Sequence, residues 1–159
     1  EEPFAEETDF DVSDIGLNIT ADESAHSVDS AVKRMEQGYR AMAIKPIAKT
    51  VSESLLVINE ASKRNIPCFC ADLTVNPLMV DINKNIASRI KTFPKINIGI
   101  FESNGAQNYK NWETMKTYHP MYGAPFTECR GGIYNLDENF YKVSGGIYRD
   151  SEYYKNIVR

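Results

Sequence analysis

The chain has 159 residues, which fits one domain with its own buried core, and its 42% hydrophobic and 25% charged residues exclude a disordered polypeptide. Its net charge is −4 and its basic residues are scattered, which argues against nucleic-acid binding. No apolar run approaches the roughly 20 residues of a membrane span, which argues against a transmembrane protein.

Four short β-type runs alternate with helical stretches in the first two thirds of the chain. The runs cover residues 16–21, 41–48, 67–74 and 96–102, and the helical stretches between them cover residues 29–37, 52–65 and 77–91. The runs begin near residues 17, 41, 68 and 96, so each β-α unit has 24 to 28 residues. Units of this length place parallel strands side by side through right-handed crossovers. We therefore predict an α/β fold.

Local signals support the three helical stretches. Gly38 follows the first stretch, where glycine commonly ends a helix. Thr50 and Glu53 have capping-box spacing at the start of the second stretch. Asn76 precedes Pro77 as an N-cap residue precedes the first residue of a helix. Apolar residues at helical spacing predict the buried faces: Ala31, Val32 and Met35; Leu55, Leu56, Ile58 and Ala61; Met79, Ile82, Ile86 and Ile90.

Two architectures fit this alternation: an open doubly wound sheet and a piece of a (β/α)8 barrel. No strand is followed by a glycine-rich phosphate loop, which argues against the doubly wound binding domain. A complete barrel needs about 200–250 residues, so four β-α units correspond to half of one.

The composition changes from about Tyr109 onward, where tyrosine, glycine and proline accumulate. Residues 131–134 and 140–143 are predicted to form two short strands of a hairpin around a turn at residues 135–139. We therefore divide the chain into a partial barrel domain, residues 1–108, and a C-terminal segment, residues 109–159, that packs back on the barrel or on a capping domain.

Ionisable and polar residues stand where the predicted strands end, which is where barrel enzymes carry their active sites. Lys45 lies in the second run, and the others lie at strand ends: Asp22 and Glu23; Asp72 and Thr74; Glu102 and Asn104. Carboxylates on neighbouring strands suit a hard divalent cation such as Mg²⁺. A nearby cation would disfavour the ammonium form of Lys45, which could then act as a base.

Three motifs in register resemble the enolase superfamily, in its mandelate racemase and muconate lactonizing enzyme group. In that family a strand ends in E-E-P or E-Q-P, the next ends in A-D-E-S, and the following strand carries I-K-x-x-K-T. This chain has E-E-P at residues 1–3, A-D-E-S at 21–24 and I-K-P-I-A-K-T at 44–50. The gaps also match, with 21 residues from Glu1 to Asp22 and 23 from there to Lys45. The resemblance extends over most of the chain, including the C-terminal segment.

The resemblance implies the C-terminal half of a (β/α)8 barrel and a role for each matching residue. Glu1 and Asp22 would be two of three magnesium ligands, Lys45 an acid/base, and Glu23 a partner that orients a ligand or Lys45. The third ligand, usually an aspartate on an earlier strand, would lie upstream of this sequence. Val51 and Ser52 replace the family's frequent Gly-Gly. Residues 70–72 (C-A-D) stand where the racemase type has a histidine, which favours the lysine-using branch.

Several of these residues have simpler interpretations that stay open. Glu1 and Glu2 could be solvated charges, Lys45 could form a structural salt bridge with Asp22 or Glu23, and Asp72 and Glu102 could cap loops. We expect the remaining candidates to be structural: Cys68 and Cys70 as small core residues, His26 and His119 as isolated side chains, and Trp112 as a packing residue beside Tyr109 and Tyr118.

The function implied is that of a magnesium-dependent lyase or isomerase that removes the proton next to a carboxylate through an enediolate. Asp72, Thr74, Glu102 and Asn104 would contribute to binding a small carboxylate substrate. Three cysteines, an odd number, do not suggest a disulfide framework, so we expect a cytoplasmic protein. The start at Glu1 without methionine suggests a piece of a longer chain. The alternative is a truncated, non-catalytic half-barrel that acts only by association, with a second copy or with the missing N-terminal half.

Overall fold

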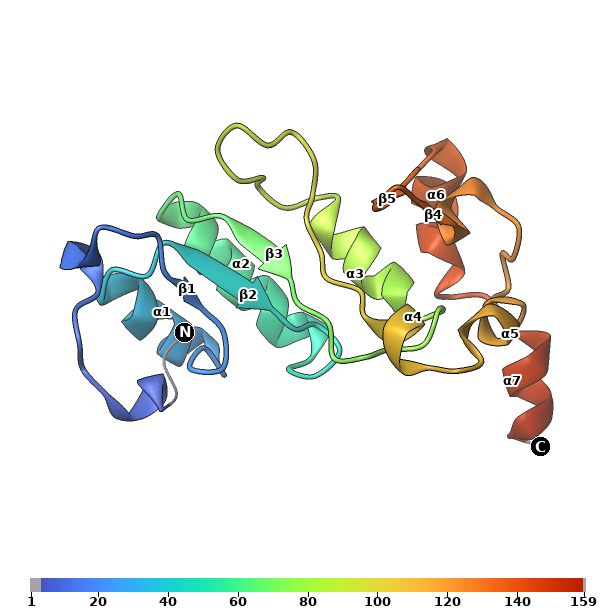
Figure 1. Ribbon diagram of the computed structural model, residues 1–159, viewed down its shortest axis with the longest axis horizontal. Helices are drawn as coiled ribbons and strands as arrows, with labels where there is room; N and C mark the ends of the chain where they lie inside the picture. The colour runs from blue at the N-terminus through green and yellow to red at the C-terminus, as the bar shows by residue number, and fades with distance from the viewer. Residues whose placement is uncertain (1–3, 159) are drawn as a thin grey trace. The chain divides into compact units, whose positions relative to one another are not determined.

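The computed structural model describes residues 4–158 and has a mixed α/β fold with a small parallel sheet (Figure 1). The chain forms two compact units: residues 4–73 with 86–102, and residues 74–85 with 103–158. This division differs from the predicted boundary between residues 108 and 109, because residues 74–85 and 103–108 pack with the C-terminal segment. Glu1, a predicted magnesium ligand, lies outside the described residues, as do Glu2 and Pro3.

The sheet of the first unit contains β1 (Thr20–Ala21), β2 (Ala41–Ile44) and β3 (Cys68–Cys70), all parallel and in sequential order. Each strand lies within one of the predicted β-type runs, and every residue of β2 is buried. The fourth run, residues 96–102, reaches the sheet only at one parallel bridge between Cys70 and Phe101. The prediction of four parallel strands is therefore confirmed for three, and the fourth is reduced to a bridge.

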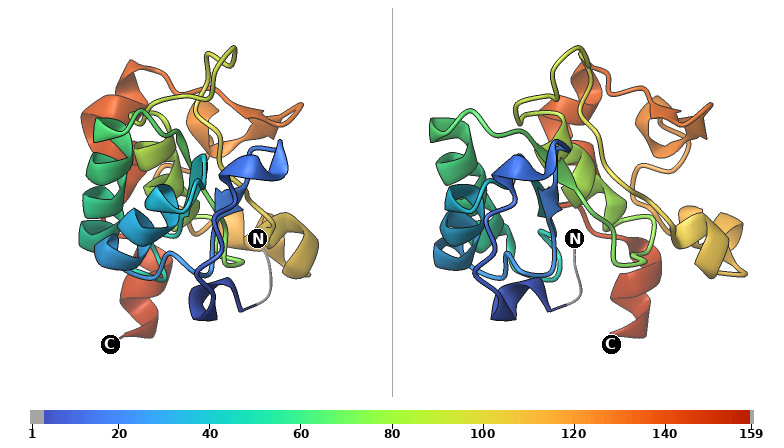
Figure 2. Two further views of the ribbon diagram at one scale, coloured as in Figure 1. Left: turned by 90° about the vertical axis from the view of Figure 1, so that its left-hand side faces the viewer. Right: turned by 60° about the vertical axis from the view of Figure 1, so that its left-hand side comes forward.

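Two helices, α1 (Val28–Glu36) and α2 (Val51–Lys63), cover one face of this sheet (Figure 2). Gly38 has a φ of 92°, a left-handed conformation that glycine adopts without strain and that ends α1 as predicted. The hydroxyl of Thr50 accepts a hydrogen bond from the backbone N–H of Glu53, so the predicted cap of α2 is present. The core between helices and sheet includes Met35 and Met42.

The buried face of α2 differs from the predicted apolar stripe. Leu55 and Leu56 are 52% and 50% exposed, whereas Ser54, Val57 and Ala61 are buried. The prediction was wrong for the two leucines, because the core takes Val57 and Ala61 of α2, with Ile58 packed against it. Both cysteines of β3, Cys68 and Cys70, are buried as expected.

The second unit contains most of α3 (Val80–Ala87), together with α4 (Gly105–Asn108), α5 (Trp112–Lys116), β4 (Cys129–Arg130), β5 (Ile133–Tyr134), α6 (Glu138–Val143) and α7 (Glu152–Ile157). Short 3-10 turns occur at Ala5–Glu7, Ser13–Ile15, Pro125–Thr127 and Ser144–Gly146. The Oδ1 atom of Asn76 accepts from the backbone N–H of Met79, which confirms the predicted cap ahead of α3. Across the part of the chain that the structure describes, helices are too short or too polar to cross a membrane.

The predicted hairpin of the C-terminal segment was placed one element too late. Antiparallel strands β4 and β5 pair across Gly131 and Gly132, whereas residues 140–143 belong to helix α6. Asp137 begins that helix because its carboxylate accepts from the backbone N–H of Phe140 at 2.8 Å. Phe140 is fully buried against Phe126, with ring centroids 5.3 Å apart. Helix packing therefore overrides the β propensity of this aromatic segment.

Candidate functional site

The carboxyl ends of β1 and β2 bring three predicted site residues together. Asp22 and Glu23 follow β1, and Lys45 follows β2, which pairs with β1 in parallel. The Nζ atom of Lys45 lies 2.8 Å from Oδ1 of Asp22 and 2.5 Å from Oε1 of Glu23. The side chain of Lys45 is 7% exposed, whereas those of Asp22 and Glu23 are 35% and 69% exposed. The lysine is thus held inside, Glu23 is exposed, and Asp22 is half-buried with its Oδ1 atom covered.

The charge of Lys45 is set by two opposing influences. Burial lowers the pKa of Lys45, but its hydrogen bonds to Asp22 and Glu23 outweigh burial and raise that pKa above its ordinary value. With both carboxylates in contact, Lys45 is therefore an ammonium ion at neutral pH. It can accept a proton only when those contacts are weakened.

A second lysine fixes the loop that carries the two carboxylates. The Nζ atom of Lys49 donates to the backbone oxygens of Asp22 at 2.9 Å and Ala25 at 2.8 Å. Both carbonyls belong to the connection between β1 and α1, so Lys49 holds this loop against the start of α2. Lys49 belongs to the I-K-P-I-A-K-T motif, but no role was assigned to it from the sequence. Its position four residues after Lys45 was the one feature of the sequence that could have indicated a place near the site.

The donor chemistry of this site suits a magnesium ion only in part. Asp22 and Glu23 offer carboxylate oxygens, the ligands that Mg²⁺ prefers. Among residues 4–158, however, no group of three or more His, Cys, Asp or Glu side chains is arranged to hold a metal ion. Of the two predicted magnesium ligands, the structure therefore describes only Asp22, because Glu1 lies outside the described residues.

The four predicted substrate-binding residues form two pairs. In the first unit, Oε2 of Glu102 accepts from the backbone N–H of Asp72 at 3.3 Å, and Asp72 Oδ1 accepts from the N–H of Leu73 at 2.7 Å. In the second unit, the hydroxyl of Thr74 donates to Oδ1 of Asn104 at 2.7 Å. The contacts of Asp72 and Glu102 are those of loop-capping carboxylates, the simpler of their two interpretations.

A buried charged cluster in the second unit was not predicted as a site. Asp81 and Lys84 are fully buried on α3, and Nζ of Lys84 lies 2.6 Å from Oδ1 of Asp81. His119, expected to be isolated, is buried, and its Nε2 lies 2.5 Å from Oδ2 of Asp81. Lys84 also donates to the backbone oxygen of Phe126 at 2.7 Å. Only the i, i+3 spacing of Asp81 and Lys84 could have signalled this cluster.

Comparison with protein-family models, with curated proteins and with solved structures gave no match for this chain. The functional argument therefore rests on the residues and their geometry.

Proposed function

We propose that the chain is the C-terminal part of the (β/α)8 barrel of a magnesium-dependent enzyme that removes the proton next to a substrate carboxylate. The observation that carries the proposal is the contact of buried Lys45 with Asp22 and Glu23 at the carboxyl ends of adjacent parallel strands. Sequential strand order with both α1 and α2 on one face agrees with a barrel wall, in which all helices lie outside. The resemblance to the enolase superfamily assigns these residues the same place.

Each residue of the site would have a distinct task. Lys45 would move the proton at the substrate α-carbon, since it is a buried amine whose charge depends on its two carboxylate neighbours. Asp22 would hold magnesium, which when bound supplies positive charge beside the substrate carboxylate. Engagement of Asp22 by another cation would remove one contact that keeps Lys45 protonated, and burial would then favour its neutral form. Glu23 would keep the amine oriented, and Lys49 would keep the loop in place.

The test uses the intact protein that contains this chain, with a panel of small carboxylic acids. Exchange of the α-proton for solvent deuterium is followed by proton NMR, and magnesium affinity by calorimetry. We expect Lys45→Ala to abolish exchange while magnesium affinity is retained, and Asp22→Asn to weaken magnesium binding. Lys63→Ala, which removes an exposed lysine of α2, is the matched control. Normal exchange by the Lys45 variant would overturn the assignment of the base.

Association without catalysis is the second candidate, and the edge of the sheet favours it. Strand β1 is an edge strand among the described residues, and Phe10 and Leu17 ahead of it are 73% and 70% exposed. Unpaired edges and exposed apolar side chains invite pairing with another chain. We expect the 159-residue chain alone to be inactive and to associate, either with a second copy or with the missing half. Light scattering that reports a stable monomer would defeat this candidate.

A further inference from the structure

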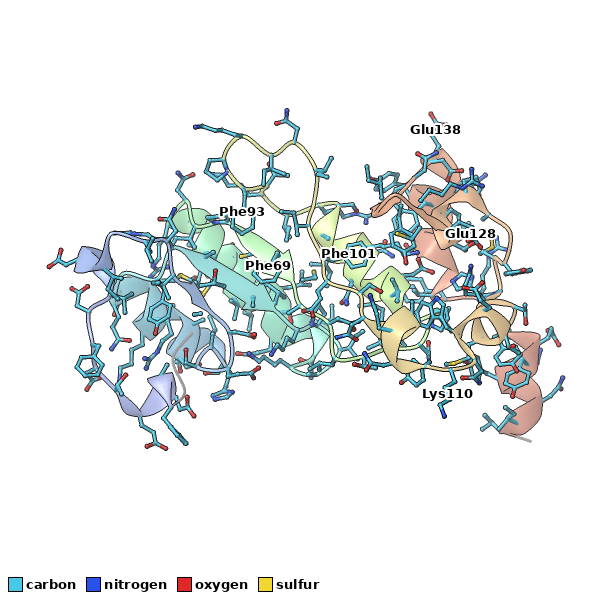
Figure 3. All side chains as sticks on the ribbon, in the orientation of Figure 1. Phe69, Phe93, Phe101, Lys110, Glu128 and Glu138 are labelled. Carbon is cyan, nitrogen blue, oxygen red and sulfur yellow. The ribbon has the colours of Figure 1, made fainter. Side chains whose placement is uncertain are left out.

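A cavity of about 200 Å³ lies within the second unit. Its lining combines two large apolar side chains, Val80 from α3 and Trp112 from α5, with four charged ones, Lys84, Lys116, Glu113 and Glu128. Glu128 lies in the segment between Pro125–Thr127 and β4 (Figure 3). An apolar cavity of about 150 Å³ can hold a benzene molecule, so this space suits a compound of one small ring.

The charges around the cavity leave a net negative charge. Nζ of Lys116 lies 2.8 Å from Oε2 of Glu128 and 3.0 Å from Oε2 of Glu113, so one ammonium serves two carboxylates. The other ammonium, Lys84, is neutralised by Asp81 behind it. Two carboxylates and two ammonium groups line the cavity, and Asp81, which is outside the lining and pairs with Lys84, makes the total three negative charges against two positive ones.

His119 adds no positive charge to this set. Its Nδ1 atom accepts a hydrogen bond from the backbone N–H of Met121 at 3.0 Å, so the ring proton lies on Nε2. That Nε2 atom donates to Asp81. Burial, the largest influence, raises the pKa of Tyr134 to about 12, so this phenol in the cavity wall is also neutral at physiological pH.

We propose that this cavity binds a small primary ammonium ion with a compact apolar body. The ammonium group would take the unshared oxygens of Glu113 and Glu128, and the hydrocarbon part would contact Trp112 and Val80. Trp112 adds a cation–π attraction, which is strongest for indole among the aromatic side chains. This site is separate in its residues from the one around Lys45, and the proposal does not depend on the proposed catalytic function.

Trp112 makes the proposal directly testable because it is the one tryptophan in the sequence and it lines the cavity. Its fluorescence is followed while the chain is titrated with three probes of similar size: benzylammonium, benzyl alcohol and benzoate. We expect benzylammonium to bind about tenfold more tightly than benzyl alcohol, the combined effect of a partly exposed ion pair and a cation–π contact, and benzoate to bind weakest.

Three variants complete the test. Glu128→Gln should reduce the preference for benzylammonium to about twofold or less, because it removes one of the two carboxylates of the lining and with it the net negative charge around the cavity. Glu138→Gln, which changes an exposed residue of α6 outside the cavity, should leave it unchanged. Ala106→Phe adds bulk at an exposed residue of the cavity lining and should abolish binding of all three probes without unfolding the chain. The proposal would be overturned if the three probes bound equally, if benzoate bound most tightly, or if no probe gave a saturable change in fluorescence. It would also be overturned if Glu128→Gln left the preference for benzylammonium unaltered.

Discussion

Lys84→Met isolates the role of the buried charge pair on α3. The side chains of Lys84 and Asp81 are 2% and 0% exposed, with Nζ and Oδ1 2.6 Å apart. Methionine keeps most of the length and apolar surface of lysine, so the change removes the charge and its hydrogen bonds while packing is largely retained. The carboxylate of Asp81 then stays buried with a neutral histidine as its remaining partner among these contacts.

The expected loss of stability is large. Removal of one partner of a buried ion pair leaves an uncompensated buried charge and typically costs about 3 to 5 kcal/mol. The backbone oxygen of Phe126 also loses its donor, which adds to the cost. Because domains are stable by only about 5 to 15 kcal/mol, we expect Lys84→Met to lose a large part of the free energy of unfolding.

Urea unfolding followed by the fluorescence of Trp112 measures this loss within the second unit. Lys63→Met is the control, because the pair of Lys63 with Glu60 is exposed and should contribute less than about 1 kcal/mol. The double variant Asp81→Asn with Lys84→Met removes the stranded charge but leaves an acceptor for His119. It should therefore be more stable than Lys84→Met alone. If Lys84→Met costs no more than Lys63→Met, or if the double variant is the less stable, the reasoning is refuted.

Three further predictions concern single side chains. Ser27→Ala should lower stability by about 1 kcal/mol in thermal melts, because Ser27 and Ser30 exchange capping hydrogen bonds at the start of α1; an unchanged melt would contradict this. Asn65→Val should cost about 1 to 2 kcal/mol in urea unfolding, because Asn65 has a φ of 63°, and Asn65→Gly should cost far less; equal losses would exclude backbone strain. Burial raises the pKa of Tyr134 to about 12, whereas tyrosine in the unfolded chain has a pKa of about 10. The buried neutral phenol therefore contributes fully to stability below about pH 10, and this contribution is lost as the pH rises through about 12. Between about pH 10 and 12 the Tyr134→Phe variant should thus lose less stability than the wild type, by at most about 3 kcal/mol. Identical curves of stability against pH for the two proteins would contradict this.

The elements that local signals specify were the ones that could be predicted. The buried run that forms β2 and the glycine after α1 depend on neighbours in the sequence, and the structure has both where they were expected. The capping box of α2 is present only in half. Thr50 caps the N–H of Glu53, but the carboxylate of Glu53 accepts from the N–H of Val28 at 2.5 Å instead of turning back. A contact between two helices displaced the local one.

The elements that depend on distant partners could not be predicted. Residues 96–102 have the composition of a strand, but Gly99 passes so close to α3 that a Cβ atom there would lie 2.0 Å from the backbone oxygen of Ala87. That course leaves only Phe101 in register with Cys70. A second contact with β3 comes from the loop before this run, where the ring of Phe93 lies near that of Phe69 (Figure 3). Nothing in the local pattern reveals such an approach.

The two candidate sites differ in the same way. Asp22, Glu23 and Lys45 could be brought together from the sequence, because the ends of adjacent parallel strands meet at one edge. The charged cluster in the second unit joins α3 to His119, which is 38 residues away in sequence and lies outside any regular repeat. No periodicity relates such positions, so only the folded structure places them together.

The chain passes between the two units three times, after residues 73, 85 and 102, so each unit is made of two separate stretches of sequence. Neither unit is therefore a continuous stretch that could emerge from the ribosome complete. The partner of Lys84 at Phe126 is 42 residues downstream, so at roughly 5–20 residues per second it is synthesised about 2 to 8 s later. During that interval the backbone oxygen of Phe126 is not yet there to accept from Lys84, so the buried contacts of α3 can be completed only after the C-terminal segment has been made.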